Sequence, residues 1–346
     1  MIKDKTILIT GGTGTLGKAV TSEILKRYEP KRVIVFSRDE YKQFIMSQQM
    51  PFKGDKRLLF MIGDVRDQAT LMNALRGVDI VVHTAALKHV STCELNPYEA
   101  IKTNVLGAQN LIQASIEQNV KKVVVLSTDK ACAPINLYGA TKLCSDKLFI
   151  NANSYSCAYG TAFSVVRFGN IAGSRGSVIP YFRGLIDQGI KKLPITDVRM
   201  TRFCLEEAEA IKMILKTIDI MHGGELFVKK APSMRIIDLA HAICEDASLY
   251  EIGMRPGERI DEAMIVGEEV QQILEFEDYF LIKPSAELDL ASYVYIGGRQ
   301  VDGDFEYTSS KNMEWLSIQQ LQDLMGRIKQ EPIFADLFGD LKVIQP

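Results

Sequence analysis

The sequence lacks a surplus of charge of either sign, and it lacks long apolar runs. Its 41 Lys and Arg residues nearly balance its 43 Asp and Glu residues, which leaves a formal net charge of −2. Nothing in this balance favours a nucleic acid or an anionic membrane as a partner. No apolar run approaches the ~18 residues that span a membrane. We therefore expect no nucleic-acid and no membrane partner, and any site for a polyanionic small molecule must be a local cluster of Arg and Lys.

Cysteine is present, but without a functional pattern. The six cysteines form no CxxC pair and no spacing typical of a metal site. The first apolar run begins within the first few residues, so we expect no signal peptide before it. These features predict reduced thiols in a cytoplasmic protein and no bound metal.

The first half of the chain alternates short β-branched runs with helical patterns. Six runs read as strands that are apolar nearly throughout: 6–10, 32–36, 58–62, 79–83, 122–127 and 163–168. Amphipathic stretches such as 15–28, 67–76 and 97–119 separate them. Strands of this kind suit a parallel sheet that is covered on both faces. We predict an α/β fold with a Rossmann-like, doubly wound parallel sheet.

The alternation of strands and helices stops after Phe168. Segment 169–200 is rich in Gly, Ser and Pro, and 226–346 mixes short strands with helices. We predict a dinucleotide-binding domain over 1–168, with parts of 199–225 returning to it. A smaller α+β substrate lobe with a C-terminal tail is expected over 169–198 and 226–346. Within it, Ser317 and Gln320 form a capping box that predicts the start of a helix.

A glycine turn follows the first expected strand directly and opens a helix. In "ITGGTGTLG", Gly11, Gly14 and Gly17 form a G-x-x-G-x-x-G pattern. Glycine permits the tight turn, the close approach of a pyrophosphate and the close packing of helix on strand. The helix N-terminus then offers free N–H groups to the phosphates. The predicted cofactor contacts in this turn are Gly11, Thr13, Gly14, Thr15, Leu16 and Gly17.

The tip of the second strand favours NADP over NAD. An acidic residue at this tip would accept the ribose 2′-hydroxyl of NAD, but Ser37 and Arg38 occupy it, with Lys42 one turn further on. A guanidinium matches the 2′-phosphate of NADP. Asp39 keeps NAD open, because its carboxylate could serve the hydroxyl if the turn shifts.

The following strand ends supply further contacts to the cofactor. Asp64 and Val65 are expected at the adenine edge, Ala85 and Ala86 beside the cofactor, and Lys88 in the crevice. Ile171 is a further expected contact. By contrast, His83 ends a buried strand and reads as a core histidine, and His89 reads as structural.

A Tyr-x-x-x-Lys pair, Tyr138 and Lys142, follows the fifth expected strand. The two residues lie one helical turn apart on the same face. An ammonium near the phenol lowers its pKa from about 10, so tyrosinate could take a proton from an alcohol. Ser127 or Thr128 could hydrogen-bond the same oxygen. The pair predicts oxidation of an alcohol carbon.

Asp129 and Lys130 precede this pair and add a second proton-transfer function. Most charged pairs in loops are solvated, but these two stand at the carboxyl end of a central strand, where α/β sheets bind substrates. An acid and a base beside a new ketone can remove the α-proton and expel a β-hydroxyl. The two pairs together predict a redox-neutral dehydration.

At these residues the chain resembles extended short-chain dehydrogenase/reductases that act on nucleotide sugars. More narrowly, it is similar to the 5-inverting UDP-N-acetylglucosamine 4,6-dehydratases of bacterial surface-sugar and flagellin-modification (pseudaminic acid) pathways. The resemblance runs almost end to end. It rests on "ITGGTGTLGK", "FSRDE", "GDVRD", "AALKHV", "NPYEAIKTNVLGAQN", "STDKA", "INLYGATK", "VVRFGNIAGSRGSVIP", "PITDVRMTRF", "MRPGE" and "DFEYTSS".

The resemblance implies roles for these residues and a product. Asp129 corresponds to the general acid, Lys130 to the C5 base, and Tyr138 with Lys142 to the oxidation pair. To act as a base at neutral pH, Lys130 is expected to have a pKa lowered from about 10.4 by desolvation or nearby positive charge. Relatives that retain the configuration at C5 carry Asp-Glu where this chain has Asp-Lys. The implied product is UDP-2-acetamido-2,6-dideoxy-β-L-arabino-hex-4-ulose, with NADP tightly bound and regenerated in each turnover. The resemblance also implies a homo-oligomer, from dimer to hexamer, built through helices 97–119 and 138–157.

The expected substrate site combines residues from several segments. Asn170 and the loop that follows it could bind phosphate and sugar oxygens, and Val178 could wall the base. Arg202 and Arg255 come from separate segments, and their guanidinium groups are expected to converge on the pyrophosphate. The full set of predicted substrate contacts is Lys88, Asn104, Thr128, Asn170, Arg175, Val178, Thr196, Arg202, Arg255 and Glu258.

Three alternatives stay open. A UDP-sugar 4-epimerase would share the fold and the tyrosine but has no use for Asp129 and Lys130. A C5-retaining dehydratase would share the reaction up to the last proton transfer. A non-catalytic, NADP-binding scaffold would usually have lost Tyr138 or Lys142, and both are present.

Overall fold

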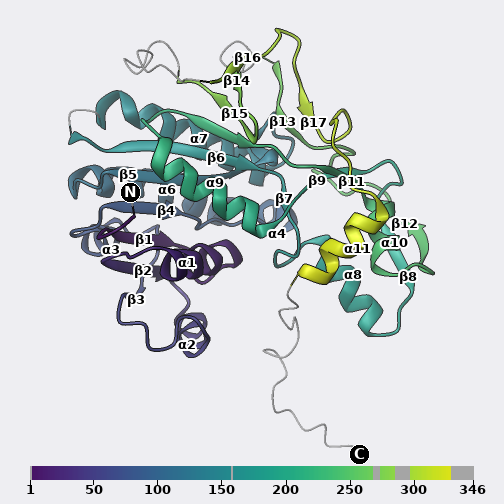
Figure 1. The fold of residues 1–346 in the computed structure, drawn as a ribbon, viewed down its shortest axis with the longest axis horizontal. Helices are drawn as coiled ribbons and strands as arrows, with labels where there is room; N and C mark the ends of the chain where they lie inside the picture. The colour runs from purple at the N-terminus through teal and green to yellow at the C-terminus, as the bar shows by residue number, and fades with distance from the viewer. Residues whose placement is uncertain (1, 157–158, 268–272, 285–296, 329–346) are drawn as a thin grey trace, which may run out of the picture.

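The computed structural model describes residues 2–156, 159–267, 273–284 and 297–328. One large sheet forms its centre, with ten strands in the order β16-β14-β15-β10-β6-β5-β4-β1-β2-β3. Helical layers cover this sheet, and a smaller group of elements lies beyond one end of it (Figure 1). The expected α/β class with a doubly wound sheet is confirmed.

All six strands expected in the first half are present. They are β1 (Thr6–Thr10), β2 (Arg32–Ser37), β3 (Leu58–Ile62), β4 (Ile80–His83), β5 (Lys122–Thr128) and β6 (Ala162–Phe168). Each pairs with its neighbours in parallel, with Thr10 aligned to Phe36 on one side and to His83 on the other. Most of their residues are buried because helices cover both faces, as continuous apolar strands require.

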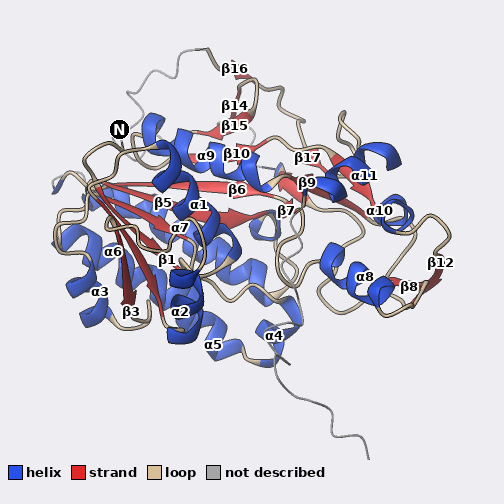
Figure 2. Ribbon diagram, turned by 60° about the horizontal axis from the view of Figure 1, so that its bottom comes forward, coloured by secondary structure: helices blue, strands red, loops and turns tan. Residues whose placement is uncertain are grey.

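The helices of the first half connect these strands. They are α1 (Thr15–Arg27), α2 (Glu40–Gln48), α3 (Gln68–Ala74), α4 (Val90–Leu95), α5 (Pro97–Ile101), the π-helical turn η1 (Lys102–Leu106), α6 (Gly107–Glu117), the 3-10 turn η2 (Asp129–Ala131) and α7 (Leu137–Ser156). Helices α3, α6 and α7 pack on one another, whereas α1 packs against α9 (Glu207–Ile220). The strands fan out between these helices (Figure 2). None of the described helices is long and apolar enough to cross a membrane.

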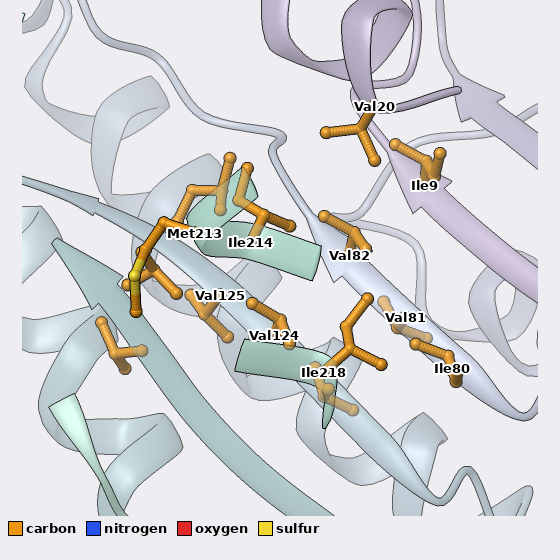
Figure 3. Packing of buried hydrophobic residues seen from close by; sticks show 14 of the residues in the cluster. Ile9, Val20, Ile80, Val81, Val82, Val124, Val125, Met213, Ile214 and Ile218 are labelled. Carbon is orange, nitrogen blue, oxygen red and sulfur yellow. The ribbon is translucent and has the colours of Figure 1, made fainter. Parts of the chain in front are cut away.

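Helix α9 returns to the first half of the chain, as expected for part of 199–225. Its apolar residues Met213, Ile214 and Ile218 lie over β4 and β5, against Val82 and Val124 (Figure 3). All five side chains are at most 1% exposed. Burying a large apolar side chain contributes about 1.5–3 kcal/mol, so this face holds α9 firmly on the sheet.

The main sheet also continues into the second half of the chain. Strand β10 (Leu226–Lys229) pairs in parallel with β6, and β15 (Tyr279–Ile282), β14 (Ile273–Glu275) and β16 (Arg299–Gln300) then add antiparallel strands. The expected boundary at residue 226 therefore does not follow the sheet. After α9 the chain adds β10 to the main sheet, passes through the smaller unit, and then returns to the sheet edge with β14, β15 and β16.

The smaller unit has a hydrophobic core of its own. It gathers α8 (Val178–Asp187), β8 (Lys192–Ile195), α10 (Ile236–Ile243), β12 (Ser248–Glu251) and α11 (Ile318–Arg327) at the right of Figure 1. Helix α11 begins at the predicted capping box of Ser317 and Gln320, which is confirmed. Residues 329–346, expected to form the tail, lie outside the described residues.

Three small sheets lie outside the main sheet among the described residues. They are built from β7 (Asn170–Ile171), β9 (Thr201–Leu205) and β11 (Ser233–Arg235), from β8 and β12, and from β13 (Ala263–Ile265) and β17 (Tyr307–Thr308). Strand β13 lies close to η2, the turn that follows β5. A segment from the C-terminal half thus reaches the carboxyl end of a central strand of the main sheet.

Candidate active site

The predicted site residues gather at the carboxyl ends of β1, β4 and β5. Strands β1 and β4 are neighbours, but the chain runs outward from β1 to β2 and β3, and in the opposite direction from β4 to β5 and β6. The loops that leave β1 and β4 therefore diverge and open a crevice between them. The glycine turn follows β1, the Ala85 segment follows β4, and Asp129 follows β5.

The glycine turn has no room for side chains at two of its three glycines. Gly11 has a φ of +62°, and a Cβ there would lie 2.8 Å from the backbone of Ala85. A Cβ on Gly17 would lie 2.6 Å from the carbonyl oxygen of Gly11, so this glycine lets α1 approach the turn. Gly14 is exposed and is the N-cap of α1. The turn thus presents the start of α1 at the carboxyl end of β1, the arrangement that binds a pyrophosphate.

Thr13 is buried in this turn, and Thr15 and Leu16 are half-buried in the first turn of α1. Behind the turn, Thr10 accepts a hydrogen bond into its carbonyl from the Thr84 hydroxyl at 2.7 Å. The Thr10 hydroxyl lies 2.7 Å from Nδ1 of His83, which is 2% exposed. Burial and the charge of Lys142 lower the pKa of His83 to about 3, so this histidine is neutral. Its expected role in the core is confirmed.

At the tip of β2, some side chains are held by short hydrogen bonds or ion pairs, and Arg38 is not. Ser37 is buried, and its hydroxyl and carbonyl both accept hydrogen bonds from Gln43 at 3.0 Å. Asp39 caps α2 through the Lys42 N–H at 2.9 Å and pairs with the Lys42 amine at 2.8 Å. These bonds from Lys42 lower the pKa of Asp39. Arg38 keeps 54% of its side chain exposed, and its nearest carboxylate, Asp64, is 3.7 Å away.

Asp64 lies at the carboxyl end of β3 and is held by Arg66. The Arg66 guanidinium donates to one Asp64 oxygen at 2.9 and 2.6 Å, and the Arg66 N–H donates to the other at 3.0 Å. Burial opposes the charge of Asp64, but these bonds outweigh it and lower its pKa. Val65 is 5% exposed and packs against Gly107. Arg66, which sequence reasoning missed, therefore fixes the loop that was expected to face the adenine.

The segment after β4 is fixed by Asn104, which was expected to bind substrate. Its amide accepts from the Leu87 N–H at 2.8 Å and donates to the Leu87 carbonyl at 2.9 Å and to the Thr141 hydroxyl at 3.0 Å. Both amide protons are used and the residue is 2% exposed. Asn104 thus holds the backbone that follows Ala85 and Ala86 rather than presenting a donor to the crevice.

Lys88 and His89 form the rim beyond that segment. The Lys88 side chain reaches the surface, yet neighbouring atoms desolvate its amine, and together with the charge of Lys130 this lowers the pKa of Lys88. Burial and the charge of Lys88 lower the pKa of His89. A Cβ on Gly176 would lie 2.2 Å from the His89 ring. The loop that follows β7 therefore lies directly against the loop that follows β4.

Asp129 and Lys130 form η2 at the end of β5 and are in direct contact. One Asp129 oxygen, Oδ1, accepts from the Thr128 hydroxyl at 2.8 Å, the Lys130 N–H at 2.9 Å and the Lys130 amine at 3.1 Å. The other, Oδ2, is buried and has no hydrogen-bond partner among the described residues. Buried oxygens are seldom left unpaired, so Oδ2 is the atom of this carboxyl group that can serve a ligand.

Glu262 adds a second carboxylate to Lys130, and no sequence pattern indicated it. The Lys130 amine lies 3.1 Å from Glu262 Oε1, and the Glu262 side chain is 4% exposed. Burial favours the neutral amine, but Asp129 and Glu262 outweigh burial, so the pKa of Lys130 is raised. A C5 base was expected to have a lowered pKa. In this structure Lys130 is instead an ammonium between two carboxylates.

Tyr138 lies near this cluster because of Gly139. A Cβ at position 139 would lie 2.0 Å from the Lys130 carbonyl oxygen, so only glycine lets the start of α7 approach η2. Tyr138 is 8% exposed and Lys142, one turn further on, is 4% exposed. Asn136 also fixes this helix start, because it accepts from the Gly139 N–H at 2.8 Å and donates to the Gly257 carbonyl at 2.8 Å.

The electrostatics of Tyr138 differ from the expectation. Burial raises the pKa of Tyr138 to about 12, while the charge of Lys130 and a hydrogen bond with Thr128 act to lower it. Thr128 lies beside the phenol, and the cation that acts on it is Lys130. Burial lowers the pKa of Lys142, and the charge of Asp146 opposes this.

On the substrate side, the segment after β6 carries unpaired polar atoms. Oδ1 of Asn170, in β7, and the Ser177 hydroxyl at the start of α8 are buried without a hydrogen-bond partner among the described residues. Ile171 is 9% exposed, Arg175 is exposed in the intervening loop, and Val178 is half-buried as the first residue of α8. Thr196, half-buried, follows β8 in the smaller unit.

Arg202 and Arg255, which were expected to converge on the pyrophosphate, both contact other groups of the protein. Arg202 donates to the carbonyls of Thr201 at 2.7 Å, Arg259 at 2.9 Å and Ile260 at 3.0 Å. Only 11% of its side chain is exposed, so its donors serve the protein rather than a pyrophosphate. Arg255 is 63% exposed and pairs with Glu258 at 3.6 Å.

Residues 257–262, here called the clamp segment, lie against the turn that connects η2 to α7. Arg259 donates to the carbonyls of Cys132 and Ala133, and the Gly257 carbonyl accepts from Asn136. Ala133 has a φ of +43°, which strains a non-glycine residue. The contacts of the clamp segment thus surround the turn between η2 and α7.

This arrangement can perform two kinds of proton transfer within one buried cluster. The phenol of Tyr138 can exchange a proton with an alcohol, with Thr128 holding its oxygen. Asp129 and Lys130, joined by a hydrogen bond, can exchange a proton with each other and act on neighbouring atoms as acid and base. The crevice beside them has the turn geometry of a dinucleotide site.

Comparisons with known proteins agree with this geometry. Residues 7–284 match the family model described as polysaccharide biosynthesis protein. A protein of Campylobacter jejuni, named UDP-N-acetylglucosamine 4,6-dehydratase (inverting), is 49% identical over 332 residues, covering 94% of this chain and 98% of the relative. A Rickettsia conorii protein named UDP-glucose 4-epimerase is 40% identical over 333 residues, covering 94% of this chain and 96% of the relative.

Among solved structures, the chain is similar to a dTDP-glucose 4,6-dehydratase, DesIV, from Streptomyces venezuelae, determined with NAD bound. The TM-score is 0.67 at 25% identity, over 74% of this chain and 86% of the other. DesIV is thus a nucleotide-sugar enzyme whose structure contains a nicotinamide cofactor.

Proposed function

The chain belongs to the polysaccharide biosynthesis protein family, and we propose that it is a UDP-N-acetylglucosamine 4,6-dehydratase that inverts the configuration at C5. The observation that carries this proposal is the buried pair of Asp129 and Lys130 beside Tyr138. Oxidation of an alcohol requires only the tyrosine. Elimination of water from the neighbouring carbons requires an acid and a base in addition.

The crevice fits a nicotinamide dinucleotide, because Gly11 and Gly17 let the turn pack closely against Ala85 and α1, and α1 begins where a pyrophosphate would lie. When bound, this cofactor supplies a hydride acceptor for C4 and a hydride donor for C6. The residues that hold it are Gly11, Thr13, Gly14, Thr15, Leu16, Gly17, Ser37, Arg38, Lys42, Asp64, Val65, Ala85, Ala86, Lys88, Tyr138, Lys142 and Ile171.

The protein's own groups move the protons. Tyr138, in its tyrosinate form, takes the proton of the C4 hydroxyl, and Thr128 lies beside it. Lys130 removes the C5 proton, which the new ketone at C4 makes acidic. Asp129 gives its proton to the C6 hydroxyl, which leaves as water. Reprotonation of C5 on the opposite face completes the inversion.

The order of proton movements follows from the bond between Asp129 and Lys130. Both groups are charged in the resting pair, which is the wrong state for an acid and a base. Transfer of one proton from the Lys130 amine to Asp129, which are 3.1 Å apart, produces a neutral amine and a carboxylic acid without any exchange with solvent. The pair regains its resting charges once Lys130 has taken the C5 proton and Asp129 has given its proton to the C6 hydroxyl.

We further propose NADP as the cofactor. Arg38 is half-exposed, with its nearest carboxylate at 3.7 Å, whereas Asp39 is engaged by the cap of α2 and by Lys42. Asp39 would have to break both contacts to accept the ribose 2′-hydroxyl of NAD. The guanidinium of Arg38 can meet a 2′-phosphate without breaking a short ion pair.

The proposed substrate contacts are Lys88, Thr128, Asn170, Arg175, Val178, Thr196, Arg255 and Glu258. Asn104 and Arg202 act indirectly, since their donors are taken by the Leu87 and Arg259 segments. The unpaired buried Oδ1 of Asn170 supports a contact to a hydroxyl or N–H of the substrate.

We also propose a homo-oligomer. Leu95, Tyr98, Ile101 and Leu106, along α4, α5 and η1, are 37–81% exposed, and an exposed apolar patch is typical of an interface. The five described cysteines carry free thiols, which suits a cytoplasmic enzyme at the start of a bacterial surface-sugar pathway.

Proton NMR of UDP-N-acetylglucosamine incubated with the enzyme and NADP in D2O tests the proposal. We expect a new 6-methyl group, an inverted C5 and deuterium at C5. Unchanged substrate would contradict the proposal and favour a non-catalytic scaffold, and a retained C5 would favour the retaining dehydratase.

A UDP-sugar 4-epimerase is the second candidate, because a 40% identical relative carries that name. It would yield the 4-epimer of the substrate without a 6-methyl signal in the same spectrum. The buried Asp129 and Lys130 pair argues against it, since epimerisation at C4 transfers no proton at C5 or C6.

A further inference from the structure

The Lys130 amine is held between carboxylates that come from opposite halves of the chain. Asp129 Oδ1 and Glu262 Oε1 each lie 3.1 Å from Nζ. The side chains of Asp129 and Glu262 are 2% and 4% exposed, and that of Lys130 is 23% exposed. A contact this dry is screened little by salt or solvent, so the second carboxylate strongly affects what Lys130 can do.

Glu262 is held in place on both its side chain and its backbone. Its Oε1 lies 3.5 Å from Nε of Arg202. Its N–H donates to the Ser309 hydroxyl at 2.9 Å, and its carbonyl accepts from the Ser309 N–H at 2.8 Å. Strand β13 begins at the next residue and pairs with β17. The backbone bonds to Ser309 and the strand that follows therefore hold the Glu262 carboxylate in place.

We propose that Glu262 is a positioning residue for the proton transfer at C5, holding the Lys130 amine together with Asp129. This inference rests on the proposed function and goes beyond it, because it gives the clamp segment a part in the chemistry. An ammonium and a neutral amine both carry N–H bonds. Glu262 can thus accept from Lys130 before and after the proton moves to Asp129, which leaves the nitrogen lone pair directed away from Glu262.

The charges around Lys130 show that Glu262 affects the protonation of the Lys130 amine. Asp129 and Glu262 favour the ammonium, and Arg202, on β9, opposes it. Lys88, from the loop after β4, and the phenol of Tyr138, on α7, complete the surroundings. Removing the negative charge of Glu262 leaves Arg202 without its partner beside Lys130. Both changes shift Lys130 toward the neutral amine.

The sign of the effect on activity follows. Besides the transfer to Asp129, loss of the Lys130 proton to solvent also yields the neutral amine as the pH rises toward the pKa of Lys130, so the rate of C5 proton removal rises with pH. Glu262→Gln keeps the shape of the side chain but lowers this pKa, so the amine forms at lower pH. Because a less basic amine is also a weaker proton acceptor, the maximal rate falls.

The test is the pH dependence of deuterium incorporation at C5, measured by NMR in buffered D2O with the holoenzyme. For Glu262→Gln we expect the midpoint of the rising limb to move down by about one pH unit, as loss of one close opposite charge predicts, with a lower plateau. Glu262→Asp, which keeps the charge, should lower the rate but leave the midpoint near that of the wild type.

Ser309→Ala is the matched control, because it removes the hydroxyl that receives the Glu262 N–H and leaves the carboxylate in place. We expect a reduced rate and an unmoved midpoint. An unmoved midpoint in Glu262→Gln, an equal shift in Ser309→Ala, or loss of incorporation at every pH in both Glu262 variants would overturn the inference while leaving the proposed function intact. A wild-type enzyme that incorporates no deuterium at C5 would overturn the proposed function, and this inference with it.

Discussion

The glycine turn and the cluster around Lys130 are built in opposite ways. The turn consists of neighbours in sequence, and its geometry depends on backbone space at Gly11 and Gly17. The cluster joins Asp129 and Lys130 with Arg202, from β9, and Glu262, from the clamp segment. Steric fit decides which residues the turn tolerates. In the cluster, the balance between burial and opposite charge decides which residues are tolerated.

This difference decides how each region responds to substitution. A misplaced atom in the turn blocks a ligand but leaves the rest of the protein intact. Loss of one charge in the cluster leaves its partners buried and uncompensated, which typically costs about 3–5 kcal/mol. The cluster should therefore give the larger effects on catalysis, and the turn should give smaller effects that appear mainly in cofactor affinity.

The largest expected effect is that of Tyr138→Phe. It removes the proton acceptor for the C4 hydroxyl but keeps the buried ring, so we expect turnover to fall by ~10²–10⁴-fold with nearly unchanged UDP-sugar binding. Product NMR and calorimetric titration measure the two quantities. Tyr155→Phe is the control, because it changes a half-exposed tyrosine on the same helix. Turnover at the wild-type level in Tyr138→Phe would make this tyrosine structural.

Separate changes at Lys130 and Asp129 should divide the reaction into steps. Lys130→Met fills similar volume without a base, so we expect no deuterium at C5 and no methyl product. Asp129→Asn removes the acid, so C5 should still exchange with solvent while elimination at C6 is lost. One NMR spectrum in D2O reports both.

Lys147→Met, an exposed position on α7, controls for the loss of a lysine and should behave as the wild type. Wild-type amounts of inverted product from Lys130→Met would remove Lys130 from the role of C5 base. Stability should be measured alongside, since Lys130→Met leaves Asp129 and Glu262 without their cation.

The same contrast explains what could be predicted from the sequence. The strands, the glycine turn and the Tyr138 helix depend on local patterns, and the structure confirms them because apolar periodicity and glycine spacing are local properties. Asp129 and Lys130 are recognisable by their place after β5. Their proximity to Tyr138 depends on Gly139, whose missing Cβ makes room for the Lys130 carbonyl.

Glu262 and the carbonyl contacts of Arg202 could not be predicted in the same way. Both depend on which strands pair in the second half of the chain, where β13 and β17 are distant in sequence and Ala263 is aligned with Thr308. A charged residue just before the short apolar run "AMIV" is the only local sign, and it does not distinguish a buried carboxylate from a surface one. The expectation of a lowered pKa for Lys130 is wrong for that reason.

Within the turn, Gly11→Ala should have the larger effect. Its φ of +62° and the 2.8 Å approach to the Ala85 backbone both oppose a Cβ, so we expect dinucleotide affinity to fall by more than ~10-fold, or about 1.4 kcal/mol. Gly14→Ala, where the nearest atom would lie at 3.2 Å, should weaken binding less. Fluorescence or calorimetric titration with the dinucleotide measures both.

Gly54→Ala separates backbone strain from steric block. Gly54 has a φ of +76°, and a Cβ added there would meet no atom within 4 Å, so its substitution should lower stability by about 1 kcal/mol and leave dinucleotide affinity unchanged. Equal affinities for the Gly11 and Gly54 variants would show that the space beside Ala85 does not limit binding of the dinucleotide.

The smallest expected effect is that of Arg38→Ala, which tests the charge of the turn region rather than its space. Arg38 is half-exposed, so solvent and salt screen its interaction with a 2′-phosphate. We expect NADP affinity to fall by ~10-fold, consistent with loss of a charge-assisted hydrogen bond, and NAD affinity to stay the same. Raising the salt concentration should reduce the difference in NADP affinity between the wild type and Arg38→Ala. Lys42→Ala is the matched control, because Lys42 is already paired with Asp39 and should contribute less. If Arg38→Ala weakened both dinucleotides equally, the guanidinium would support the fold of the β2 tip, and Asp64, 3.7 Å away, would be the group whose position it maintains.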